Sequence, residues 1–87
     1  MMTATKKQPF NTFTMAEIAK RVMSAEIVAV MADNVVISRR FRDDTEFEAV
    51  QFSSNGNCVK GWWNPDRDWD YPSDIREGES GTFTPTE

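Results

Sequence analysis

The residues best suited to chemistry in this chain are carboxylates near its C-terminus. Counting from Asp66, acidic residues stand at the positions where a calcium-binding EF-hand loop carries its oxygen ligands. Tyr71, however, takes the place of the glycine that gives that loop its sharp turn, and Pro72 restricts the backbone further. We therefore predict no metal and no cofactor, and interpret the carboxylates as solvated turn residues, with a calcium titration to test the alternative. The acidic positions are Asp66, Asp68, Asp70, Asp74 and Glu77.

A second group of carboxylates, Asp43, Asp44, Glu46 and Glu48, lies near the middle of the chain. Paired carboxylates can hydrolyse glycosides or phosphates when a pocket separates their pKa values, but a thin domain offers little pocket. The chain has no histidine, so Cys58 lacks the usual base of a cysteine nucleophile. We predict that the protein is not an enzyme.

Basic and aromatic residues come together around Phe41, where Arg39, Arg40 and Arg42 form a short basic stretch. Such residues on a sheet can hold a nucleic-acid backbone and stack its bases. One alternative is therefore single-stranded nucleic-acid or nucleotide binding through Arg39, Arg40, Lys60 and exposed aromatic rings. The other is that these arginines pair with nearby Asp43, Asp44 and Glu46.

The segment from 61 to 79, GWWNPDRDWDYPSDIREGE, mixes aromatic side chains with aspartates. Tryptophan, tyrosine and arginine are the residues most enriched in interface hot spots, and aspartates around them would steer a basic partner. We expect at least one of Trp62 and Trp63 in the core, because neighbours on a strand face opposite sides. The predicted partner-binding residues are Asp66, Arg67, Asp68, Trp69, Asp70, Tyr71, Asp74, Asp43, Asp44, Glu46 and Glu48.

Charge is unevenly distributed along the 87 residues, whose formal net charge is −4. Residues 1–65 carry eight basic and seven acidic side chains, whereas residues 66–87 carry two basic and seven acidic ones. An acidic protein is a poor candidate for binding phosphates directly but a fair one for binding a protein that does so. The chain has no membrane-length apolar run and a single cysteine, so we expect a cytoplasmic protein.

A helix is predicted over about residues 15–24, because apolar residues recur there with helical spacing. Thr14 and Glu17 form a capping-box pattern at its start, and Phe13 and Ile18 fit a hydrophobic staple. A helix this short needs a surface to lie on.

Four strands are predicted to supply that surface, over residues 26–32, 35–41, 46–52 and 58–63. Asp33-Asn34 and Asn55-Gly56 are typical of two-residue hairpin turns. The first turn would pair Ala32 with Val35 and Val30 with Ile37, and would place Val28, Val30, Val35 and Ile37 on the face beneath the helix. The second would pair Phe52 with Val59 and Ala49 with Trp62, and would set Gly61 opposite Val50.

The sequence thus predicts an α+β fold, with an N-terminal helix packed on a four-stranded antiparallel meander and followed by an acidic C-terminal loop and tail. We expect a flexible arm over 1–12, one domain over 13–75, and a disordered tail over 76–87.

In size, acidity, α+β plan and lack of catalytic motifs, the whole chain resembles the anti-CRISPR proteins, small inhibitors of bacterial defence encoded by phages and mobile elements. The resemblance implies a non-enzymatic inhibitor that occupies the basic nucleic-acid-binding surface of a defence protein, with carboxylates standing in for phosphates. A second alternative is a small structural phage protein that self-associates through an open sheet edge.

Overall fold

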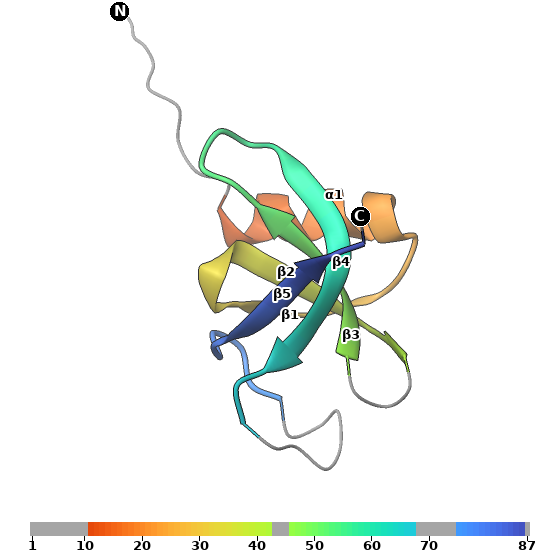
Figure 1. The fold of residues 1–87 in the computed structure, drawn as a ribbon. Helices are drawn as coiled ribbons and strands as arrows, with labels where there is room; N and C mark the ends of the chain where they lie inside the picture. Colours follow the sequence, from red (N-terminus) through yellow and green to blue (C-terminus); the bar gives the residue numbers. More distant parts are fainter. Residues whose placement is uncertain (1–10, 43–45, 68–74, 87) are drawn as a thin grey trace, which may run out of the picture.

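One helix and a five-stranded antiparallel sheet form the structure, a computed structural model that describes residues 11–42, 46–67 and 75–86 (Figure 1). The strands lie in the sheet in chain order, so each pairs with its neighbour in the sequence. The predicted α+β class and antiparallel sheet are confirmed, whereas the prediction of four strands missed the fifth. The elements are α1 (Thr12–Met23), β1 (Ile27–Met31), the 3-10 turn η1 (Ala32–Asn34), β2 (Val35–Arg42), β3 (Glu46–Phe52), β4 (Cys58–Pro65) and β5 (Gly81–Pro85).

Helix α1 begins earlier than the capping-box pattern predicted. Asn11 is the N-cap, and its side-chain oxygen accepts a hydrogen bond of 2.8 Å from the Thr14 backbone N–H. The predicted cap at Thr14 was wrong because asparagine is an equally good cap and stands three residues earlier. The helix ends at Met23 and is followed by its C-cap, Ser24, which has a left-handed φ of 53°. Within the described residues, no helix has the length and apolar character needed to span a membrane.

The first hairpin turns over three residues instead of two. Asp33 and Asn34 have the expected positive φ angles, 66° and 58°, but Ala32 also belongs to the turn, so Met31 pairs with Val35. The predicted register was therefore wrong by one residue. Such a slip moves side chains to the other face of a sheet.

The second hairpin shows the same one-residue difference, because the Ser53 N–H donates to the Asn57 carbonyl and leaves three residues in the loop instead of two. Gly56, with φ of 94°, closes a turn by donating its N–H to the Ser53 carbonyl at 2.9 Å, as in a hairpin loop with a glycine bulge. Phe52 consequently pairs with Cys58, Ala49 with Gly61 and Val50 with Lys60, which corrects all three predicted pairings.

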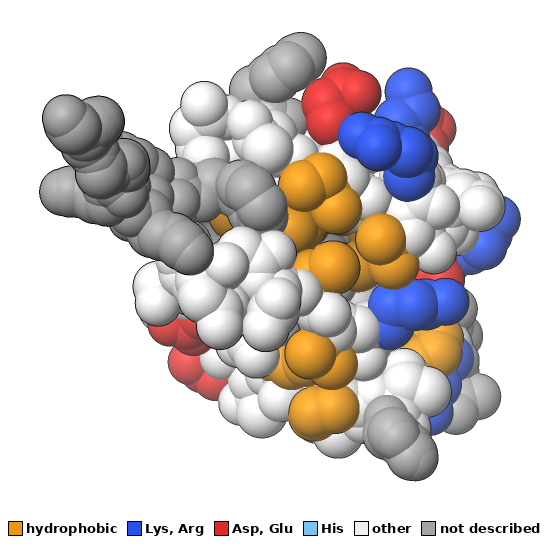
Figure 2. Space-filling view, turned by 90° about the horizontal axis from the view of Figure 1, so that it is seen from above, with side chains coloured by type: hydrophobic (Ala, Val, Ile, Leu, Met, Phe, Trp, Pro, Cys, Tyr) orange, Lys and Arg blue, Asp and Glu red, His pale blue; other side chains and the backbone are white. Residues whose placement is uncertain are grey.

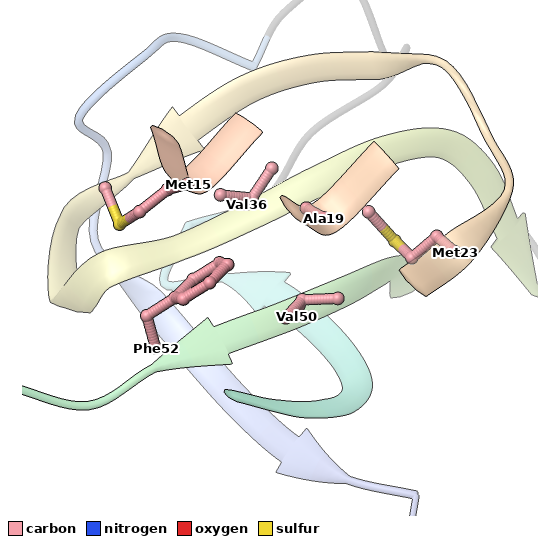
Figure 3. Close-up of a cluster of buried hydrophobic side chains, with 6 residues drawn as sticks. All are labelled: Met15, Ala19, Met23, Val36, Val50 and Phe52. Carbon is pink, nitrogen blue, oxygen red and sulfur yellow. The ribbon is translucent and has the colours of Figure 1, made fainter. Parts of the chain in front are cut away.

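The sheet buries one hydrophobic cluster on each face. The first lies under α1, whose Met15, Ala19 and Met23 are buried as their spacing predicted (Figure 3). The second lies on the opposite face, so the prediction that Val35 and Ile37 face the helix was wrong. The buried members of the first cluster are Met15, Ala19, Met23, Val36, Val50 and Phe52, and those of the second are Met31, Val35, Ile37, Phe47, Ala49 and Trp63.

Residues predicted to form a disordered tail help to cover the second cluster. Strand β5 pairs with β4, and Phe83 packs against that cluster. Gly61 makes room for the Phe83 ring, because a Cβ at position 61 would lie 2.6 Å from its Cζ. The ordered domain therefore runs beyond residue 75, and the prediction of disorder over 76–87 was wrong for β5.

The segment before β5 returns to the first strand of the sheet. The Gly78 N–H donates to the Val30 carbonyl at 2.9 Å, and the Ala32 N–H donates to the Glu79 carbonyl at 3.1 Å. The sheet is thus curled, with the chain around residues 78–79 lying beside β1.

Candidate partner-binding site

The two predicted acidic segments start from the same end of the sheet. In an antiparallel meander, the β2–β3 and β4–β5 connections leave at one end and the β1–β2 and β3–β4 connections at the other. Arg42 pairs with Glu46 at the start of β3, next to the end of β4, where Pro65 pairs with Gly81. In Figure 1 these strand ends lie at the lower end of the sheet, away from α1.

The β4–β5 connection is closed at its base by an ion pair between Arg67 and Glu79. The Arg67 Nε contacts Glu79 Oε2, and its Nη2 donates to Glu79 Oε1 at 3.2 Å. Glu79 Oε1 also accepts a hydrogen bond of 3.1 Å from the Arg76 N–H. The hydrogen bond from Arg67 is the main cause that lowers the pKa of the Glu79 carboxyl, with help from the Arg76 N–H and against some desolvation.

Both ends of the acidic segment between β4 and β5 are attached to the folded domain. Asp66 donates its N–H to the Ser80 carbonyl at 3.2 Å, and its exposed carboxylate lies 3.5 Å from the Thr82 hydroxyl. At the other end, Ile75 packs against the second hydrophobic cluster. The predicted contact residues Asp68, Trp69, Asp70, Tyr71 and Asp74 lie outside the described residues, as do Asp43 and Asp44.

Glu46 is already engaged by an arginine of the neighbouring strand. Arg42 places its Nη2 2.6 Å from Glu46 Oε1, and its guanidinium lies 4.6 Å from the centroid of the Trp62 ring. A cation over an aromatic face at this distance is attracted by the ring quadrupole. Glu46 is therefore partly neutralised within the chain.

Glu48, on the same face of β3, accepts a hydrogen bond of 3.1 Å from the buried Ser38 hydroxyl and lies 3.8 Å from Arg40 Nη1. Its side chain is only 16% exposed. Glu48 is therefore a structural acceptor within the sheet and presents little carboxylate surface to a partner.

The two adjacent tryptophans have opposite environments, as strand alternation predicted. Trp63 is fully buried in the second cluster, with its ring centroid 6.2 Å from that of Phe47. Within the described ranges, the Trp63 indole N–H has no hydrogen-bond partner. Trp62 is half-buried on the other face, beneath Arg42. Among the aromatic side chains that the structure describes, Trp62 is the one that lies beside charged side chains at the surface.

The basic residues considered for nucleic-acid binding are largely paired with carboxylates. Arg39 Nε lies 3.3 Å from Glu26, and Arg40 donates to the Ser24 carbonyl at 3.2 Å in addition to its contact with Glu48. Lys60 is exposed on β4. Figure 2, which looks down on the molecule from above, shows lysine and arginine side chains gathered on one side of a central hydrophobic area. The alternative of arginine–carboxylate pairing is therefore confirmed for Arg42, which pairs with nearby Glu46. Arg39 and Arg40 also contact carboxylates, but these are Glu26 and Glu48.

Sequence reasoning missed the Arg67–Glu79 pair and β5. The alternation Thr-Phe-Thr over 82–84 was a signal for a strand, but its acidic, glycine-containing surroundings favoured a tail. No family model, curated protein or solved structure matches this chain.

Proposed function

We propose that this protein is a non-enzymatic inhibitor or adaptor that binds a basic protein surface through the acidic end of its sheet. We define the acidic end as residues 42–48 and 66–79. The observation that supports it is topological: the β2–β3 and β4–β5 connections, which carry two acidic stretches about twenty residues apart in sequence, leave the sheet at the same end.

The charge arithmetic favours this end as the binding surface. Residues 42–48 carry one basic and four acidic side chains, a net charge of −3, and residues 66–79 carry two basic and six acidic ones, a net of −4. These ranges sum to −7, so the remaining residues carry +3 to give the total of −4. A protein with this uneven distribution of charge would approach a basic surface with its acidic end first.

Internal pairing narrows the set of contact residues. Glu46 and Glu48 already interact with arginines, so their mutation would disturb the sheet as well as a partner. The aspartates of 66–74, together with Trp69 and Tyr71, are the better candidates for direct contact. The Arg67–Glu79 pair and Ile75 hold the ends of this segment close together, which lowers the ordering cost of binding.

The anti-CRISPR resemblance suggests the class of partner. A defence nuclease or its nucleic-acid-loading subunit has a basic groove, and aspartates spaced along a segment could occupy it in place of phosphates. Duplex DNA and this protein would then compete for the same surface.

The proposal is tested by capture from a bacterial lysate on immobilised protein, with elution by duplex DNA. The variant Asp66→Asn, Asp68→Asn, Asp70→Asn removes three charges from the acidic end. The matched control Glu17→Gln, Glu26→Gln, Glu87→Gln removes three charges elsewhere in the sequence. We expect the immobilised wild-type protein to capture a basic protein, which duplex DNA should elute. The control variant should still capture this protein, and the triple asparagine variant should not. Equal retention by both variants would contradict the proposal.

A further inference from the structure

Strand β5 is an edge of the sheet, and its hydrogen-bonding pattern shows which backbone groups face outward. Just before β5, the Ser80 carbonyl accepts from the Asp66 N–H at 3.2 Å; just after it, the Thr86 N–H donates to the Lys60 carbonyl at 3.0 Å. In an antiparallel ladder only alternate residues bond to a given neighbour. The even-numbered residues of β5 therefore bond to β4.

The odd-numbered residues Gly81, Phe83 and Pro85 consequently direct their backbone groups away from β4. Gly81 and Phe83 each offer an N–H and a C=O, whereas Pro85 offers only a C=O. No backbone hydrogen bond reaches these outward groups from the described part of the chain.

The end of the other edge strand, β1, is covered. The segment around Gly78 and Glu79 lies beside it and bonds to Val30 and to Ala32 of the following turn. Within the described ranges, β5 offers a row of outward backbone groups to another strand over Gly81, Phe83 and Pro85.

β5 has no charged residue to protect this edge, and its one proline, Pro85, removes only one outward donor. Natural edge strands discourage pairing with charged side chains, above all lysine, with prolines, with bulges or with short length. β5 has the sequence GTFTP, with no charged residue and its proline at the end. Its two threonines are exposed, so an incoming strand would meet small polar side chains.

We propose that β5 pairs antiparallel with β5 of a second copy of this chain, which joins the two sheets into one across a twofold axis. Antiparallel pairing of identical strands is the arrangement that closes as a dimer. With the axis at Thr82 or at Phe83, both outward N–H groups of each copy meet an outward carbonyl of the other copy. Pro85 has no N–H, but its absence does not remove a hydrogen bond donated by Gly81 or Phe83 in either arrangement. The inference is independent of the proposed function, because β5 lies outside the acidic end.

The most specific test removes one outward N–H and keeps every side chain. Cys58 permits assembly of the full chain by ligation of an expressed segment ending at Asn57 to a synthetic segment that begins at Cys58 and carries N-methyl-phenylalanine at position 83. The same ligated chain without the methyl group is the control. Because the Phe83 N–H faces away from β4, the methyl group leaves the internal ladder intact.

Sedimentation velocity from about 10 µM to about 1 mM protein then reports the dimer. We expect the control to dimerise with rising concentration, and the N-methyl chain to have a dissociation constant at least about tenfold higher. A control that stays monomeric throughout overturns the proposal, and so does a dimer that the methyl group leaves unchanged.

A second pair of variants guards against loss of folding in the ligated protein. Thr84→Lys places a charge on exposed β5, and Ser54→Lys places the same charge on the exposed β3–β4 turn. We expect the first to weaken the dimer by at least about tenfold and the second to leave it unchanged. In both variants the circular dichroism spectrum should remain that of the wild type. Equal dimerisation by both folded variants would also overturn the proposal.

Discussion

Replacing Phe83 by alanine should destabilise the whole domain, because this side chain covers part of the second hydrophobic cluster. Its ring lies over the space left by Gly61, and it is half-buried. A fully buried phenylalanine loses about 3–5 kcal/mol on truncation to alanine, so half burial gives about 2 kcal/mol.

That loss is large for a chain of this length. Stabilities of about 0.05–0.15 kcal/mol per residue give a total of about 4–13 kcal/mol here. For a domain of this size each kcal/mol shifts the melting temperature by about 4–8 °C, so Phe83→Ala should lower it by about 8–16 °C.

Thermal and urea unfolding followed by circular dichroism measures the effect, with Thr84→Ala as the matched control. Thr84 neighbours Phe83 on the same strand but is exposed, so its truncation should change stability by less than about 0.5 kcal/mol. If Phe83→Ala and Thr84→Ala have the same melting temperature, then Phe83 contributes nothing to the core. Residues 76–87 would then behave as the disordered tail that the sequence suggested.

Three further predictions concern the glycine, the ion pair and the acidic segment. Gly61→Ala should lower the urea midpoint by an amount equivalent to about 1–3 kcal/mol, because the new methyl group collides with the Phe83 ring and the Thr84 carbonyl; an unchanged midpoint would show that the two strands do not approach this closely. Glu79→Gln should reduce stability at neutral pH by no more than about 1 kcal/mol, measured by urea unfolding against pH. Because the pKa of Glu79 is lowered in the folded state, its contribution is present above the unfolded pKa and is lost as the pH falls through the folded pKa. A difference between wild type and Glu79→Gln that grows on acidification would contradict this sign. Calcium at millimolar concentration should leave the melting temperature unchanged, because Tyr71 replaces the glycine that the EF-hand loop needs; a rise with calcium but not with sodium at equal ionic strength would restore the metal-site interpretation.

The helix and the first four strands could be predicted because their signals are local. Met15, Ala19 and Met23 repeat with helical spacing, and all three are buried. Positive φ angles at Asp33 and Asn34 also follow from residue type.

The register could not be predicted because it depends on a single additional turn residue. Once Ala32 joins the first turn, Val30 packs with the cluster under α1 and Val35 lies on the opposite face. The strand pattern is compatible with either register, and packing on both faces selects between them.

Strand β5 depends on contacts that are distant in sequence. Its residues Thr82, Phe83 and Thr84 favour a strand, but a strand of this length is stable only beside β4, with the Phe83 ring over Gly61. In a meander the β2–β3 and β4–β5 connections leave the sheet at the same end, so that part of the candidate site could be predicted from the sequence. The pairing of Arg67 with Glu79 was not, because it requires the chain to return along β5.

The most direct measurement of the central claim is hydrogen exchange of this protein with and without its captured basic partner. If the acidic end is the binding surface, amide protection on complex formation should concentrate in residues 42–48 and 66–79 and should disappear with the Asp66→Asn, Asp68→Asn, Asp70→Asn variant. Protection confined to α1 or to the 53–57 turn, with no change over 66–79, would contradict the account.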